Sequence, residues 1–363
     1  NNGRLYLAPS EEQVVISEQA NPSWIPEEEM NQDSPNLVSG RGYGITHWKE
    51  LFTNRQLTAL TTFSDLIKEA QAKASQDALT AGMPEDQIGI ANGGSGAKAY
   101  AEAIGVYLTF MVEQLANHSS SACSWNSPNQ QMRAVFARQA IPMVWDYAES
   151  NIFSNSSGSY KNLFDRLIKG FSILGVSDKV GIARQFVARA DQNINNVMVS
   201  TDPPYYDNIA YGDLSDFFYV WMRRSLKETY PDLFTTVIVP KQDELVATSY
   251  RFEGGAKEAQ AFFEKGMLES FKRLFNYADG EIPVSVYYAY KQSDTDEEEE
   301  NQIVTSAGWE TMLSALIQAG FCIAGTWPMR TEKPGRSVSN QTNALASSIV
   351  LVCRKREEDA GVV

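Results

Sequence analysis

The sequence predicts a mixed α/β fold with a helix-rich N-terminal half and a sheet-containing C-terminal half. Apolar residues recur at three- and four-residue steps between about residues 50 and 120, which is the period of an amphipathic helix. After about residue 196, short runs rich in β-branched residues alternate with further helical patterns, as in an α/β unit. Apolar residues make up 43% of the 363 residues and charged residues 21%, so the chain can bury a core and is not disordered.

The N-terminal half divides into a lead-in and a helical module. Residues 1–40 mix Pro, Asn, Ser and acidic residues with little periodicity, so we expect an extended lead-in with one short strand at residues 4–7. The helix-rich module is expected over residues 41–175. Its predicted helices cover residues 50–82, the segment that follows the Gly-rich break at 91–96, and residues 129–149.

The second region is expected over residues 176–356, followed by a tail at 357–363. A strand at 197–201 is predicted to end at Asp202, and residues 185–188 are predicted to form the strand before it. The later elements are helices at 214–229, 256–275 and 309–319 and strands at 284–290, 321–329 and 347–353. Gly320 is expected to close the helix at 309–319. Phe217, Phe218 and Trp221 make an apolar helix face that we interpret as core packing.

Composition excludes several classes of protein. The 31 Lys and Arg residues against 45 Asp and Glu residues give a net charge of −14, which argues against a large sequence-independent grip on nucleic acid. Three cysteines and two histidines are too few and too scattered for common metal chemistry, so no metal site is expected. No apolar run approaches the length of a membrane span, so no membrane contact is expected. The odd cysteine count and the lack of a visible secretory signal favour the cytoplasm.

The segment that carries chemistry is Ser200-Thr201-Asp202-Pro203-Pro204-Tyr205-Tyr206-Asp207-Asn208. An apolar strand runs directly into Asp-Pro-Pro-Tyr, and neither proline has the N–H that would continue the strand. In α/β sheets, ligands bind at the carboxyl ends of strands. The motif therefore places an acid, a rigid turn and an aromatic ring at the expected active-site edge.

This motif resembles the Asp-Pro-Pro-Tyr signature of amino-methyltransferases, which use S-adenosylmethionine to methylate the exocyclic amino group of adenine or cytosine. An aryl amine is a poor nucleophile because its lone pair is delocalised into the ring. The resemblance implies that Asp202 and the carbonyl of Pro203 accept the two amino hydrogens, while Pro204 stiffens the turn. It also implies that Tyr205 stacks on a flipped-out base, with Tyr206, Asp207 and Asn208 lining the same pocket.

Longer segments are similar to adenine-specific DNA methylases of the DUF1156, zinc-ribbon-containing family. They are residues 42–45, 51–57, 136–140, 201–211, 214–221, 327–332 and 343–348. The resemblance implies a Rossmann-like S-adenosylmethionine-dependent methyltransferase sheet, S-adenosylmethionine as cofactor and DNA as partner, the latter bound weakly by so acidic a chain. The glycine loop that holds the cofactor in such enzymes has no counterpart here. The chain is therefore expected to correspond to their C-terminal part and to work with a missing N-terminal region or a partner subunit.

Further site residues follow from the resemblance. Asp191 and Thr201 are expected to face the cofactor, as is Asp146 through a loop that resembles part of a cofactor pocket. Trp327 and Glu332 are expected to touch the base. Three alternatives stay open: amino methylation of cytosine, methylation of RNA or of a protein amide, and a non-catalytic nucleic-acid-binding subunit in which this fold supports a partner.

Overall fold

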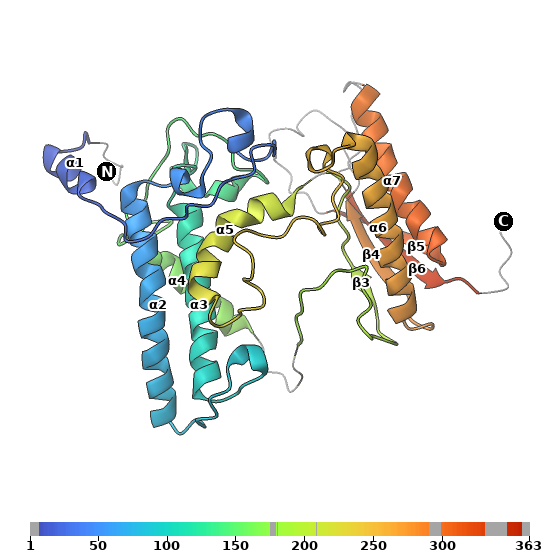
Figure 1. Ribbon diagram of the computed structural model, residues 1–363, viewed down its shortest axis with the longest axis horizontal. Coiled ribbons are helices and arrows are strands. Elements are labelled where there is room, and N and C mark those ends of the chain that lie inside the picture. The colour runs from blue at the N-terminus through green and yellow to red at the C-terminus, as the bar shows by residue number, and fades with distance from the viewer. Residues whose placement is uncertain are drawn as a thin grey trace. The chain divides into compact units, whose positions relative to one another are not determined.

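The computed structural model describes residues 7–174, 179, 181–207, 209–289, 299–330 and 347–357, and these residues form a mixed α/β fold (Figure 1). The chain packs into two compact units. We call them the helical unit, residues 1–180 and 211–241, and the sheet unit, residues 181–210 and 242–363. Helix α5 (Tyr211–Leu226) thus belongs to the helical unit, although the chain that precedes it and the chain that follows residue 241 belong to the sheet unit.

The helical unit is built mainly from two long helices that run side by side, α2 and α3, and from α5 (Figure 1). Its elements are α1 (Glu11–Glu18), α2 (Asn54–Thr80), α3 (Ala97–His118), the strands β1 (Ser124–Asn126) and β2 (Gln131–Arg133), α4 (Tyr160–Ile173) and α5. Short 3-10 turns lie at Ser39–Arg41, Trp48–Leu51, Ile90–Asn92 and Val135–Ala137. The predicted helices at residues 50–82 and after residue 96 are confirmed.

Local sequence explains where α2 begins, and aromatic packing explains why α5 joins this unit. The Thr53 hydroxyl accepts from the Gln56 amide, and the Gln56 side chain accepts from the Thr53 amide, which is a capping box. Phe217 on α5 stacks on Phe52 with ring centroids 5.7 Å apart. Phe217 and Trp221 are almost completely buried, so their prediction as core residues is confirmed.

Two predictions for the N-terminal half are wrong. Residues 129–149 do not form an α-helix, because the segment holds the second strand of the β1–β2 hairpin, a 3-10 turn and irregular chain. Its turn places Gln130 at φ +49°, and Pro142 lacks the amide that a helix interior needs. The helix of this region is α4, further along the chain. The lead-in also contains α1, whose capping box joins Ser10 and Gln13, whereas residues 4–6 of the expected strand lie outside the described residues.

The sheet unit holds a four-stranded sheet in the order β3-β4-β6-β5. The strands are β3 (Ser200–Thr201), β4 (Val284–Ala289), β5 (Phe321–Arg330) and β6 (Ser347–Lys355). β3 and β4 are parallel, and β6 is antiparallel to both of its neighbours, β4 and β5. It follows that β3, β4 and β5 run in one direction, so their carboxyl ends lie at the same end of the sheet.

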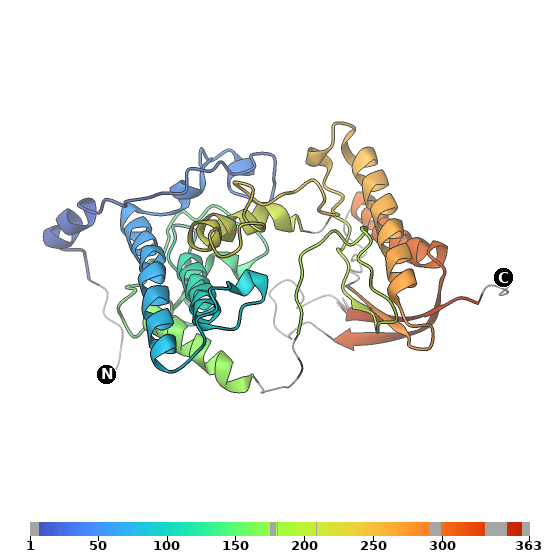
Figure 2. The same ribbon diagram turned by 60° about the horizontal axis from the view of Figure 1, so that its bottom comes forward.

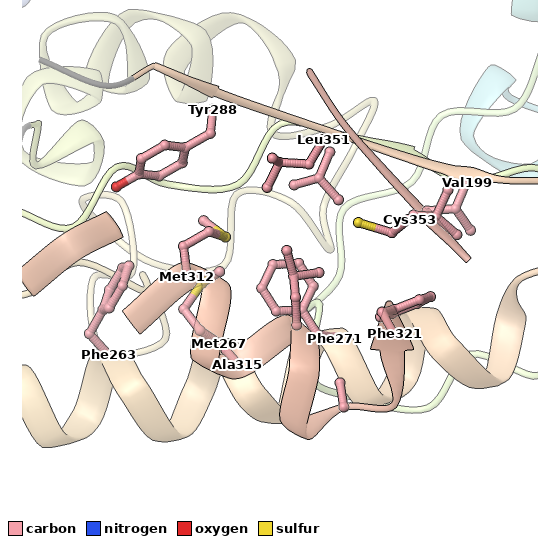
Figure 3. Close-up of a cluster of buried hydrophobic side chains, with 14 of the residues drawn as sticks. Val199, Phe263, Met267, Phe271, Tyr288, Met312, Ala315, Phe321, Leu351 and Cys353 are labelled. Carbon is pink, nitrogen blue, oxygen red and sulfur yellow. The ribbon is translucent and has the colours of Figure 1, made fainter. Parts of the chain in front are cut away.

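Helices α6 (Gly255–Tyr277) and α7 (Glu299–Gln318) lie side by side along one face of this sheet (Figures 1 and 2). A 3-10 turn at Ser249–Arg251 precedes α6. Alternate residues of β4 point into the core, where they meet Phe271 of α6, Met312 of α7 and Leu351 of β6 (Figure 3). Gly320 ends α7 with φ +104°, a left-handed conformation that favours glycine.

The predicted helices at 214–229, 256–275 and 309–319 and the strands at 284–290, 321–329 and 347–353 are confirmed within a few residues, except that α7 begins earlier, at Glu299. Two strand predictions need correction. The strand at 197–201 pairs in the sheet only at its last two residues, since Val197 makes an isolated bridge to Ala278. Residues 185–188 form no strand, because none of their backbone amides joins a ladder.

Candidate active site at the carboxyl end of β3

The Asp-Pro-Pro-Tyr motif follows directly after β3. Thr201 is the last residue of the strand and pairs with Val286 of β4. Asp202 comes next and is exposed. The Tyr205 hydroxyl donates a hydrogen bond to the Asp202 carboxylate, with 2.6 Å between Tyr205 Oη and Asp202 Oδ1. The structure therefore brings the acid and the ring of the motif together and leaves the acid open to solvent.

Two anchors hold the turn after the prolines. Pro203 is buried, and neither proline has an N–H to satisfy. Tyr206 adopts φ +57°, a left-handed conformation that is uncommon for a residue with a bulky side chain. Its carbonyl accepts from the Ala247 amide at 3.0 Å, and its ring meets the Phe263 ring edge-on at 5.2 Å. The strained residue is thus fixed on both its backbone and its side chain.

An aromatic wall from β4 and α7 lies beside the motif. Tyr288 meets the Tyr205 ring edge-on with centroids 5.3 Å apart, and the centroid of the Trp309 ring lies 5.4 Å from that of Tyr288. Tyr288 and Phe263 lie at the same end of the core cluster, opposite to Val199 and Cys353 (Figure 3). The motif therefore lies against the end of the packed core.

Gly308 is the residue of α7 that lets this wall form. A Cβ at position 308 would lie 3.1 Å from Tyr206 Cβ and 3.3 Å from the Tyr288 hydroxyl. These distances are tighter than ordinary van der Waals contact, and the Tyr206 contact is to an atom fixed next to the backbone. Glycine therefore permits the close approach of α7 to both tyrosines.

Burial raises the pKa values of three side chains in this region. Burial, together with the nearby Asp207 carboxylate, raises the pKa of Tyr288 to about 12. Burial also raises the pKa of Asp207 and that of Tyr206, although Asp207 keeps an exposed surface. Tyr288 is accordingly a neutral phenol at physiological pH and can donate a hydrogen bond.

Trp327, another expected site residue, lies away from the motif. Trp327 lies on β5, and the register aligns Thr201 with Val286, Leu351 and Thr326. Trp327 therefore stands at the same end of the sheet as Asp202 but three strands away, about 14 Å at the usual strand spacing. Its side chain is 70% exposed. The structure does not bring it into contact with the motif.

Asp191, which was expected at the end of a strand, lies instead in an exposed loop of the sheet unit. Its carboxylate accepts from the Asn193 amide at 3.2 Å and lies 3.4 Å from Arg273 of α6. Asp146 belongs to the helical unit and so is not part of the unit that carries the motif. Asn208 and Glu332 lie outside the described residues.

Sequence reasoning missed Tyr288 and Gly308. One signal for Tyr288 was present, because Val284, Val286 and Tyr288 alternate along β4 and so share one face, which puts the tyrosine at the carboxyl end of the strand beside β3. No local signal marks Gly308, since its importance depends on how α7 packs on the strands.

Comparisons with protein-family models, curated proteins and solved structures find no match for this chain. Among the described residues, no helix combines the length and the hydropathy that a membrane crossing requires.

Proposed function

We propose that this chain carries the catalytic region of an S-adenosylmethionine-dependent DNA amino-methyltransferase that acts on the exocyclic amino group of adenine. The observation that carries the proposal is the Asp202–Tyr205 pair at the open carboxyl end of β3, where the carboxylate is exposed and the ring is held by its own hydrogen bond. The strand order, with β5 and β6 antiparallel and β3 and β4 parallel, supports the Rossmann-like sheet that we propose for this reaction.

In this proposal the motif works by positioning and electrostatics. The Asp202 carboxylate accepts one amino hydrogen and the Pro203 carbonyl accepts the other, which frees the nitrogen lone pair for attack. Tyr205, fixed by Asp202 and by the edge of Tyr288, would stack on the base. The anchored turn keeps these groups in place without reorganisation during the reaction.

The side chains at the end of β3 fit the methyl-bearing part of the cofactor. S-adenosylmethionine supplies a methyl group on a positively charged sulfur, and the exposed carboxylate of Asp202 and the faces of nearby tyrosine rings favour a cation. Asp191 fits its expected role less well, because its carboxylate is already engaged by Arg273 and by the Asn193 amide. Asp202 and Tyr205 are therefore the residues that we expect to face the cofactor and the base.

The first test is calorimetric titration of the folded chain with S-adenosylmethionine and with S-adenosylhomocysteine. Micromolar binding to the parent chain, lost in Asp202→Ala and kept in the exposed control Asp232→Ala, is the expected result. Transfer of labelled methyl groups to unmethylated DNA, followed by nucleoside mass analysis, then separates N6-methyladenine from N4-methylcytosine. RNA and protein substrates are parallel arms of that assay.

A split or non-catalytic subunit is the second candidate. It is favoured by the position of β3, which is an edge strand of the sheet among the described residues, and by the absence of a glycine loop from the sequence. If the folded chain binds neither form of the cofactor, the single-chain enzyme is contradicted and the subunit is supported. Activity should then return only with a longer protein or with a partner that supplies the cofactor site.

A further inference from the structure

The helical unit presents large aromatic side chains to solvent. Trp145 is 77% exposed and Tyr43 is 48% exposed, and their rings meet edge-on with centroids 5.8 Å apart. Tyr147, two residues after Trp145, is 43% exposed. We call these three side chains the aromatic group. Neighbouring apolar rings on a surface often mark a site that binds another molecule, and the proposed methyl transfer does not use them.

The two rings that touch belong to segments far apart in the chain. One segment is residues 34–49 and the other is residues 114–145. Leu37 of the first segment makes a parallel bridge to Ile141 of the second, whose amide donates to the Asn36 carbonyl at 2.8 Å. The ring contact therefore continues a backbone pairing, which fixes the two segments side by side.

Neither of these segments contains an acidic residue. The chain has 45 Asp and Glu residues among 363 and a net charge of −14, yet residues 34–49 and 114–145 have no carboxylate. Their Lys and Arg residues are Arg41, Lys49, Arg133 and Arg138. The aromatic group thus stands on a locally basic part of an acidic chain, which is the charge that favours an anionic partner.

Arg133 lies on the same face of a small sheet as one ring of the aromatic group. It is paired with Ser124 in the β1–β2 ladder, and Tyr147 makes an antiparallel bridge to the same serine. Directly paired residues of neighbouring strands carry their side chains on one face. Arg133 and Tyr147 therefore flank Ser124, about 10 Å apart at the usual strand spacing.

The arginines of the second segment are available to a partner. Arg133 and Arg138 are exposed, and neither guanidinium forms an ion pair or a hydrogen bond in the part of the chain that the structure describes. Of the next two carboxylates along the chain, Glu149 is engaged by Arg55 at 2.8 Å, whereas Asp146 is exposed. Two unpaired guanidinium groups against one exposed carboxylate keep the local charge positive.

Exposed rings beside unpaired guanidinium groups suit a single-stranded nucleic acid. Unpaired bases stack on aromatic side chains, and arginines bind the phosphates between them. In a duplex the base faces are covered by their neighbours and cannot reach the rings. We propose that the surface made of Tyr43, Trp145, Tyr147, Arg133 and Arg138 binds an unpaired stretch of DNA. The choice of DNA over RNA rests on the proposed function, whereas the surface rests on residues of the helical unit alone.

The test is fluorescence anisotropy of a dye-labelled DNA single strand of about 20 nucleotides, titrated with the whole chain at several salt concentrations. The single strand is expected to bind at about 50 mM salt and to weaken as salt rises. The duplex of the same sequence is expected to bind at least fivefold more weakly. A single strand that does not bind at low salt, or a duplex that binds equally well, would overturn the proposal. An RNA strand of the same sequence that binds tenfold more tightly would overturn the choice of DNA.

Variants assign the binding to this surface. Trp145→Ala is expected to weaken the single strand at least fivefold, the lower end of base–aromatic stacking, and Trp145→Phe is expected to stay within about threefold of the parent. Arg133→Ala is expected to reduce the slope of log affinity against log salt by about 0.7, the value for one phosphate contact on a single strand. The controls are Tyr100→Ala on α3 and Lys73→Ala on α2, which remove an exposed ring and an exposed charge elsewhere.

The substituted side chains are exposed, so the variants are expected to fold with nearly unchanged melting temperatures. Equal losses in the controls would overturn the proposal, since binding would then follow net charge and not this surface. Unchanged affinity in Trp145→Ala would also overturn it and leave the rings to a different partner, such as another protein chain. Binding that needs Trp145 in a chain without affinity for S-adenosylmethionine would uphold this inference and contradict the single-chain enzyme.

Discussion

The Tyr288 phenol links the chemistry of the candidate active site to the stability of the sheet unit. In an unfolded chain a tyrosine has a pKa near 10, whereas burial and the Asp207 carboxylate raise the pKa of Tyr288 to about 12. Between these values the unfolded chain has released its proton and the folded chain still holds it. The free energy of unfolding must therefore fall as pH rises from about 10 towards 12.

Tyr288→Phe is expected to remove this contribution, which is on the order of 2 kcal/mol over that pH range. Urea unfolding of the parent and the variant at several pH values between 9 and 11.5 measures it. Tyr287→Phe, which removes a more exposed phenol from the same strand, is the matched control. The interpretation fails if Tyr288→Phe loses stability with pH as steeply as the parent chain does.

At this scale the sequence predicts the residues of the site that are adjacent in the chain and misses those that meet through the fold. Asp202 and Tyr205 lie three positions apart, and a turn between them follows from the two prolines. Tyr288 reaches them only through the parallel pairing of β3 and β4.

At the scale of the elements, α7 must approach the motif closely, and Gly308 allows it. Gly308→Ala is expected to displace Tyr206 or Tyr288, since the new Cβ would lie 3.1 Å from Tyr206 Cβ and 3.3 Å from the Tyr288 hydroxyl. Alanine gains up to about 1 kcal/mol of helix propensity over glycine, which offsets part of the strain. The expected outcome is a chain of nearly unchanged stability with at least a tenfold loss of cofactor binding or methyl transfer.

Gly170→Ala is the matched control for this substitution. Gly170 lies within α4, and a Cβ there meets no atom within 4 Å. The control should therefore show the propensity gain alone, as a higher denaturant midpoint with unchanged binding. Equal gains in stability and unchanged binding for both variants would show that the wall beside the motif does not need glycine at position 308.

The helices with continuous apolar periodicity are predictable from sequence because their pattern is local. The segment at 129–149 misleads because its apolar residues also fall near helical spacing, while the positive φ of Gln130 and the ring of Pro142 impose a hairpin and irregular chain. The strand before Asp202 is also shorter than its sequence predicts. Val197 to Thr201 reads as five residues of strand, but only Ser200 and Thr201 find partners in the sheet.

At the scale of the whole chain, the assignment of α5 is the feature that local patterns could not supply. The sequence predicts a helix with an apolar face at 214–229 and includes it in the region 176–356. The structure gives residues 211–241 to the core of the helical unit, because that face meets Phe52 and is buried among its residues. Which core receives an amphipathic helix is decided by long-range packing, which periodicity does not encode.

This assignment predicts how the chain behaves when it is cut between the units. A protease recognition sequence inserted between residues 174 and 181 gives two fragments, and the second carries α5. Since Phe217 and Trp221 of α5 are buried in the helical unit, and each such side chain contributes about 2–3 kcal/mol when buried, the fragments are expected to elute together in gel filtration under native conditions.

Once the chain is cut, association of the two fragments is expected to depend on the buried face of α5. The cut chain with Trp221→Ala should separate at a clearly lower urea concentration than the cut parent, because truncation of a buried Trp costs about 3–5 kcal/mol. The uncut chain with the same insertion controls for the added residues, and Tyr211→Ala, which truncates an exposed side chain of α5, controls for substitution on that helix. Fragments that separate without denaturant, or a Trp221→Ala midpoint equal to the parent's, would mean that α5 does not hold the two parts of the helical unit together.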